Sequence, residues 1–135
     1  IVGRNVDDLL QFRPNADEQI KNDLPNEFGI PNHHPDPTQP EHDNHHILTG
    51  SDTKGRLYSA NATCKDWTSS EAPVGKEKGA RYGLSWPTSK KGQWISQAST
   101  PGCKAGMHIK GGDGAPGIIG GKGGYGGIYC FAITP

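Results

Sequence analysis

The sequence predicts an α+β domain built mainly from short strands and long irregular loops, with few helices. Of the 135 residues only 31% are hydrophobic, while 20 are glycine and 11 are proline, so apolar runs are short. Weak helical patterns occur only near the start, whereas the second half holds short aromatic and β-branched segments separated by turns. A chain of this length suits a single domain, which we place at residues 1–135.

The helical patterns come first. Residues 1–12 fit a short strand or turn followed by one helical turn, and residues 17–24 carry a second weak helical pattern. Pro25 ends this pattern, because proline lacks the backbone N–H that a helix interior needs. Residues 25–46 then form a long loop rich in proline and histidine. Loops of this length inside a compact domain are usually functional or disordered.

The strand-like segments follow, at 47–49, 56–58, 82–86 and 93–95, with turns at 50–55 and 87–92. Residues 111–127 indicate a glycine-rich loop. The last segment, 129–133, is aromatic and β-branched with almost no polar residue, so we expect a buried strand at the centre of a sheet.

Charge and motif content exclude several functions. The 14 basic and 14 acidic residues cancel, so no long-range field favours nucleic acid or an anionic membrane. No stretch approaches the roughly 20 apolar residues of a membrane span. The sequence also lacks a nucleophile elbow, a phosphate-binding loop, a haem motif and a paired-carboxylate motif. We therefore expect a protein that binds rather than an enzyme.

Three cysteines, Cys64, Cys103 and Cys130, lie in segments typical of extracellular structure, which predicts a secreted or periplasmic location. A thin core in a small domain usually needs cross-links or partners. The odd count leaves one cysteine that either bonds to a second peptide or remains a buried free thiol. The chain begins at Ile1 without an initiator methionine, so we also expect a processed or trimmed product.

Short motifs in a fixed order resemble a known family. They are Ile1-Val2, Asp7-Asp8-Leu9-Leu10, His45–Arg56 with its Gly-Ser-Asp-Thr-Lys-Gly-Arg, Cys64-Lys65-Asp66-Trp67-Thr68 and Cys130-Phe131. Together they resemble the endostatin-like branch of the C-type-lectin-like fold, including bacterial relatives that carry Thr-Gly-Ser and Asn-Trp-Thr-Ser-Ser segments. The resemblance covers most of the chain, although residues 13–44 match poorly.

This resemblance implies short twisted antiparallel strands and a disulfide between Cys64 and Cys103. It also implies that Cys130 pairs outside this chain, because the cysteine that bonds the family's last strand lies on an N-terminal helix upstream of Ile1. The chain would then be the C-terminal two-thirds of the domain, and its partner a missing N-terminal fragment or a second chain.

The densest group of metal-ligating side chains lies in the loop at 25–46. Imidazoles and carboxylates at this density can bind zinc, although an ordinary polar surface loop is the alternative. The family's zinc site uses N-terminal histidines and an aspartate that matches Asp7 or Asp8, so it is not transferred intact. For calcium, Gln39-Pro40-Glu41 is similar to the tripeptide of sugar-binding lectins, but their Trp-Asn-Asp is missing. The candidate ligands are His33, His34, Asp36, Glu41, His42, Asp43, His45 and His46.

Three further groups are candidates for a surface role. Asn61-Ala62-Thr63 is an acceptor pattern for N-glycosylation. Aromatic residues could stack on sugars, but we expect them in the core, Trp67 above all. Basic residues could bind sulfated glycans, as in the family, or form a solvated face. The aromatic group is Tyr58, Trp67, Tyr82, Trp86, Trp94 and Tyr125, and the basic group is Lys76, Lys78, Arg81, Lys90 and Lys91.

These features predict an extracellular, non-catalytic binding module for a glycan or matrix polymer, or for a protein partner. One alternative is a structural accessory subunit of a larger extracellular or periplasmic assembly. A second is a metal-binding protein or metal-dependent enzyme that uses the histidine-rich loop.

Overall fold

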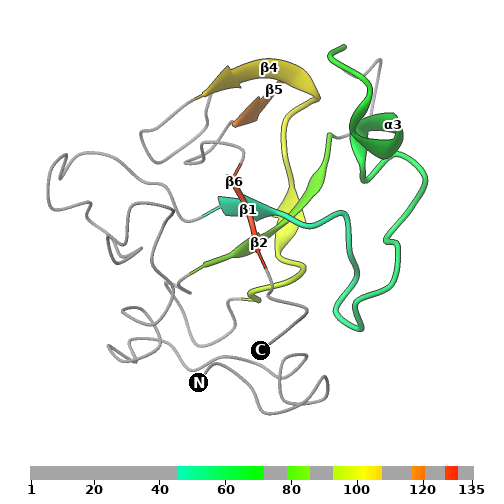
Figure 1. Cartoon of the computed structure of the whole chain (residues 1–135), viewed down its shortest axis with the longest axis vertical. Helices are drawn as coiled ribbons and strands as arrows, with labels where there is room; N and C mark the ends of the chain where they lie inside the picture. The colour runs from blue at the N-terminus through cyan, green and yellow to red at the C-terminus, as the bar shows by residue number, and fades with distance from the viewer. Residues whose placement is uncertain (1–45, 72–78, 86–92, 108–116, 121–126, 131–135) are drawn as a thin grey trace, which may run out of the picture.

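A computed structural model describes residues 46–71, 79–85, 93–107, 117–120 and 127–130 of the chain (Figure 1). This part is mostly β, with a four-stranded mixed sheet, a two-stranded sheet and one short helix. None of the helices among these residues is long and apolar enough to cross a membrane. The elements are β1 (His46–Leu48), α3 (Cys64–Trp67), β2 (Arg81–Leu84), β3 (Ala98–Ser99), β4 (Lys104–Met107), β5 (Ile118–Gly120) and β6 (Gly127–Ile128).

The larger sheet has the strand order β3-β2-β1-β6. β1 pairs antiparallel with β2, placing His46 opposite Leu84, and β2 pairs antiparallel with β3. The expectation of antiparallel strands is wrong for the other two pairs, because β6 runs parallel to β1 and β5 runs parallel to β4. The helical patterns at 1–12 and 17–24 lie outside the described residues.

The core lies on one face of this sheet. Leu48, Tyr82 and Leu84 are buried there together with Ala80, because residues two apart along a strand point to the same face. Cys64 completes the cluster, and its burial brings the segment that carries α3 against the sheet. The cluster is small, as the low hydrophobic content predicts.

Several predicted segments differ from the structure. The segment 56–58 is not a strand; only Leu57 forms an isolated bridge, with Ser51. Residues 93–95 are not a strand but a bend beside β2, and the strand that follows is β3. The loop expected at 111–127 contains β5 and the first residue of β6, and the loop expected at 25–46 ends where β1 begins, at His46. The segment expected to be a central buried strand, 129–133, begins after β6, which ends the strand order, and Ile128 is 68% exposed.

Two glycines make the smaller sheet possible. A Cβ on Gly102 would lie 2.2 Å from the carbonyl oxygen of Gly117, so only a glycine lets the two backbones come this close. The Lys104 N–H then donates to the same oxygen at 2.9 Å, which starts the parallel pairing of β4 with β5. A glycine-rich segment therefore supplies a strand as well as a loop.

Candidate functional site

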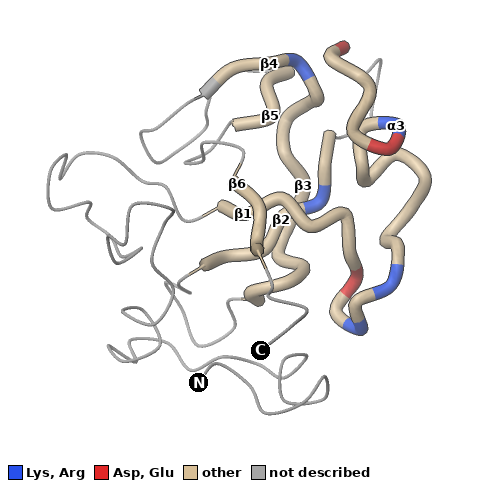
Figure 2. Tube along the Cα trace, viewed as in Figure 1, with Lys and Arg blue, Asp and Glu red and all other residues tan. Residues whose placement is uncertain are grey.

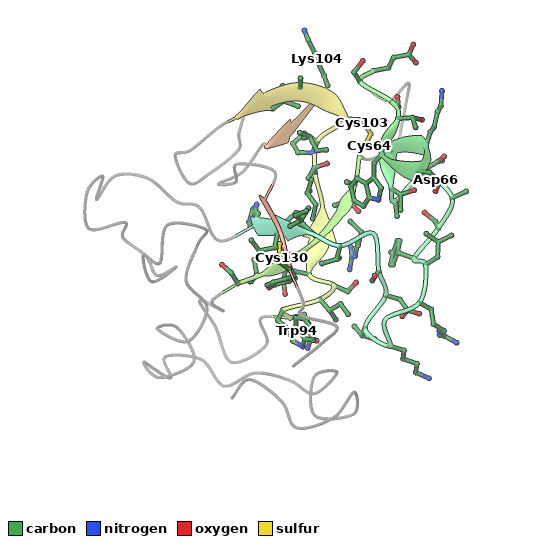
Figure 3. All side chains as sticks on the ribbon, in the orientation of Figure 1. Cys64, Asp66, Trp94, Cys103, Lys104 and Cys130 are labelled. Carbon is green, nitrogen blue, oxygen red and sulfur yellow. A yellow bond between two sulfur atoms is a disulfide. The ribbon has the colours of Figure 1, made fainter. Side chains whose placement is uncertain are left out.

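The disulfide that the resemblance implies is present. Cys64 and Cys103 are bonded with their Cα atoms 5.6 Å apart, which joins the start of α3 to the residue before β4 (Figure 3). Cys130 is a free and exposed thiol, so the alternative of a buried free cysteine is wrong. Its pairing with a cysteine outside this chain stays a prediction.

α3 is a left-handed turn. Its four residues, Cys64–Trp67, have φ angles between 51° and 64°, a region that costs residues other than glycine about 1–2 kcal/mol each. Hydrogen bonds close the turn: the Trp67 N–H donates to the Thr63 carbonyl at 2.6 Å and the Asp66 N–H to the Thr63 hydroxyl at 3.1 Å. The disulfide fixes its first residue, so the strained conformation is held by this bond and by the hydrogen bonds to Thr63.

This turn places an aromatic ring on the surface. Trp67 is 49% exposed, so the expectation that it belongs to the core is wrong. One edge of its ring instead lies over Gly50, where a Cβ would be 3.4 Å from Cζ2 of Trp67. Tyr58, from the segment after the 52–56 turn, is 51% exposed, so the expectation of a core position is wrong for it as well; its neighbour Leu57 is 61% exposed. We call Leu57, Tyr58, Trp67 and Arg81 the aromatic surface.

Arg81 is the cation of this surface. Its guanidinium carbon lies 4.4 Å from the centre of the Tyr58 ring, a cation–π contact. Its Nε–H donates to the Ser96 hydroxyl at 2.9 Å, and its backbone bonds both to Ala62 and to residues 49 and 50. Within the described ranges no carboxylate forms an ion pair with Arg81.

The other charged groups near this surface include two ion pairs. Figure 2 shows them mainly along the 52–56 turn and around α3. Arg56 pairs with Asp52 at 3.0 Å, and Lys65 lies 3.9 Å from Glu71 with both side chains strongly exposed. The Arg56 backbone N–H, followed by the Lys54 N–H and the Arg56 guanidinium, lowers the pKa of Asp52 below its usual 3.8 despite some desolvation.

Sequence-predicted site residues fall mostly outside the described part. Of the candidate metal ligands, only His46 lies in the part of the chain that the structure describes. It is buried in β1, and its ring stacks on that of Tyr82 with centroids 3.9 Å apart. The residues that the structure describes hold no group of three metal-ligating side chains. Asn61 is exposed. Outside the description lie His33, His34, Asp36, Glu41, His42, Asp43, His45, the tripeptide 39–41, Lys76, Lys78, Lys90, Lys91, Trp86 and Tyr125.

A separate pocket of about 210 Å³ lies on the β1–β6 side. Two of its lining residues are aromatic, Trp94, which is buried as expected, and Tyr129. Their rings meet edge to face with centroids 5.4 Å apart. The Tyr129 hydroxyl donates to the Trp94 carbonyl at 3.0 Å, which fixes this corner. Sequence patterns gave no signal for the pocket, because it joins three distant segments. The described lining is Leu48, Thr49, Ser51, Trp94, Ile95, Ile128 and Tyr129.

No family model, curated protein or solved structure matches this chain. Its function is therefore inferred from the aromatic surface and the pocket themselves.

Proposed function

We propose that this chain is an extracellular, non-catalytic binding module that holds an acidic glycan on the aromatic surface. The observation that carries the proposal is Arg81, a partly buried cation stacked on the half-exposed ring of Tyr58, with no ion-paired carboxylate among the described residues. A carboxylate or sulfate on a sugar would supply a counter-charge to this guanidinium.

The Arg81 guanidinium contributes a positive charge to the proposed site. A cation removed from water costs free energy unless an anion or hydrogen bonds compensate it. Arginine has five N–H donors in a rigid fork, and Ser96 takes one at 2.9 Å and a second at 3.4 Å. The remaining donors suit a carboxylate or sulfate, which planar guanidinium groups bind in bidentate geometry.

Tyr58 and Trp67 contribute exposed aromatic rings to the proposed site. Their rings are about half exposed, in a domain whose other described tryptophan is buried. An exposed ring face carries partial negative charge, and the polarised C–H groups on one side of a pyranose complement it. Exposed apolar groups gathered in one place mark binding sites more often than chance.

The strained turn supports the same assignment. Backbone strain of several kcal/mol persists only where the surroundings impose it, and such strain is concentrated at binding and catalytic sites. Here the disulfide and Thr63 impose it, and its consequence is the outward position of Trp67. A ring held rigidly before binding loses little entropy when a ligand arrives. The disulfide itself suits an oxidising compartment.

The endostatin-like fold is part of the proposal, supported by the Cys64–Cys103 bond and by the short strands with long connections. A second candidate function is the accessory subunit. It is favoured by Cys130, an exposed thiol two residues after the exposed Ile128, because this arrangement suits a disulfide to a second chain beside β6.

Binding to three hexasaccharides, one sulfated, one built of uronic acids and one neutral, tests the proposal by calorimetry. We expect the acidic sugars to bind and the neutral one to bind at least about tenfold more weakly, because it lacks the charge-assisted hydrogen bonds. Arg81→Gln should weaken the binding of the acidic sugars about tenfold or more. Arg81→Lys should weaken it less, since lysine keeps the charge but lacks the planar guanidinium that binds an anion through two parallel hydrogen bonds.

Arg56→Gln is the matched control, because Arg56 is already paired with Asp52, lies outside the aromatic surface and keeps in the variant the backbone N–H that bonds Asp52 within the 52–56 turn. Its affinity should stay within about twofold of the wild type. Equal losses in Arg56→Gln and Arg81→Gln would indicate unspecific charge attraction and contradict the site. Absence of binding to all three sugars by the folded protein would refute the glycan proposal and leave the accessory subunit.

A further inference from the structure

We propose that the pocket between Trp94 and Tyr129 is a second binding site, independent of the aromatic surface, and that its ligand is a neutral phenolic ring. The pocket lies between β1, the bend at 93–95 and the residues around the end of β6. Its volume of about 210 Å³ exceeds the roughly 150 Å³ that accommodates a benzene ring in an apolar cavity.

The lining determines the polarity of the ligand body. Three aliphatic residues, Leu48, Ile95 and Ile128, line the pocket together with Trp94 and Tyr129. No charged side chain is among the described lining residues, so an ion would lose its hydration without compensation. A flat apolar ring gains both hydrophobic burial and edge-to-face contacts with the two aromatic walls.

The Thr49–Ser51 segment supplies two hydroxyl groups to the lining, which also holds the Tyr129 hydroxyl and the Trp94 indole N–H. The Thr49 hydroxyl donates to the Ile95 carbonyl at 2.5 Å, and the Ser51 hydroxyl donates to the Thr49 carbonyl at 3.0 Å. Each hydroxyl hydrogen is thus used within the fold, and each oxygen retains acceptor capacity. The segment therefore suits a ligand that donates one hydrogen bond, as a phenol hydroxyl does.

A sugar ring fits this lining less well. A pyranose carries hydroxyls around its whole rim, whereas the described lining has hydroxyl side chains only at Thr49, Ser51 and Tyr129, and each of these already donates its hydrogen within the fold. Hydroxyls placed against the aliphatic and aromatic walls would stay unsatisfied, at a cost comparable to a lost hydrogen bond each. The phenolic ring can come from a free small molecule or from a tyrosine side chain of a peptide, which present the same chemistry.

NMR titration of the whole chain with 4-ethylphenol, and separately with N-acetyltyrosinamide, tests the proposal. The reporter is the indole N–H of Trp94, assigned by its loss in Trp94→Phe; this N–H is buried and has no hydrogen-bond partner in the described ranges. We expect a saturable shift with 4-ethylphenol and about fivefold weaker binding of ethylbenzene, which lacks the donor. Saturation by N-acetyltyrosinamide as well would identify a tyrosine side chain as an accepted source, whereas its exclusion would restrict the site to free phenols.

Ile128→Asp places a charge in the lining at a side chain that is 68% exposed, and should weaken 4-ethylphenol binding about tenfold. Leu57→Asp is the matched control, since Leu57 is 61% exposed and not in the lining. Ser51→Ala, which leaves the strands intact, should weaken binding about fivefold, and Ser59→Ala should not. Arg81→Gln should leave 4-ethylphenol binding unchanged, so this site can fail while the glycan proposal stands.

Three outcomes would overturn the proposal: a shift that grows linearly without saturation, equal affinity for ethylbenzene and 4-ethylphenol, or equal losses in Ile128→Asp and Leu57→Asp.

Discussion

At the scale of single residues, the Asp52 carboxylate organises a complete turn. One of its oxygens accepts the backbone N–H groups of Lys54 and Arg56 at 2.8 and 3.0 Å, and the other accepts two donors from the Arg56 guanidinium. The turn positions the residues that follow it, Leu57 and Tyr58, on the aromatic surface. These hydrogen bonds favour the charged carboxylate, and for this reason the pKa of Asp52 is lowered.

A lowered pKa fixes the sign of the pH dependence. The stabilisation is fully present above the unfolded pKa of about 3.8, and is lost as pH falls through the still lower folded pKa. We expect carbonyl NMR titration to place the pKa of Asp52 below 3.8, and the stability advantage over Asp52→Asn to shrink as the solution is acidified below that value.

Arg56→Gln separates the causes of this pKa shift. The substitution removes the guanidinium but keeps the backbone N–H of residue 56, which is the largest cause. The pKa of Asp52 should therefore rise in Arg56→Gln and yet stay below 3.8. A return of the pKa to 3.8 would show that the Arg56 guanidinium, and not the backbone N–H groups, lowers it.

Residue chemistry was partly predictable from the sequence. The basic group included Arg81, and the aromatic group included Tyr58 and Trp67. Their exposure was not predictable, because it depends on a left-handed turn of four residues that have no glycine among them. No local sequence signal marks such a turn, since its conformation is imposed by the disulfide and by Thr63.

At the scale of elements, Gly83 in β2 determines how the bend at 93–95 lies beside the sheet. A Cβ at Gly83 would lie 1.8 Å from the carbonyl oxygen of Trp94 and 2.7 Å from the nitrogen of Ile95. Both are backbone atoms, so the contact cannot be relieved by a rotamer change. The bend carries Trp94 and Ile95, and therefore two walls of the pocket.

Gly83→Ala should thus destabilise the fold by about 3 kcal/mol and open the Trp94–Tyr129 corner. Gly127→Ala in β6 is a matched control, because its Cβ would meet only the flexible end of Ile47, at 3.3 Å. We expect it to cost less than about 1 kcal/mol. Urea unfolding followed by tryptophan fluorescence measures both, and equal costs would contradict the role of Gly83.

The elements predicted correctly are those with a strong local pattern. β1 and β2 carry apolar and aromatic residues of high β-propensity and agree with the sequence to within a residue or two. β4 has the sequence Lys-Ala-Gly-Met, which carries no such pattern, and it becomes a strand only through its partner β5. The residues after Ile128 have high β-propensity, yet β6 ends at Ile128, because strand position is decided by long-range pairing.

At the scale of the whole molecule, the disulfide links the larger sheet to the smaller one, and Ile119 of β5 also packs against the buried cluster. Cys64 belongs to the buried cluster on the larger sheet, and Cys103 precedes β4 of the smaller one. The low hydrophobic content of the sequence predicted a small core that needs a cross-link. It could not predict the mixed sheet, since parallel pairing joins segments that are far apart in the chain.

The bond joins two cysteines with a sequence separation of 39, for which loss of unfolded-chain entropy gives about 3–4 kcal/mol. Replacing Cys64 and Cys103 together by serine should therefore lower the free energy of unfolding by about that amount. The backbone NMR chemical shifts of Lys65 and Asp66 should also no longer indicate positive φ angles, because the turn loses the bond that fixes its first residue. Cys130→Ser is the control: its thiol is exposed and unbonded within the chain, so the change should stay within about 0.5 kcal/mol. If the double variant kept both its stability and the positive φ angles, Thr63 and the surrounding packing alone would hold the turn, and the disulfide would have no part in presenting Trp67.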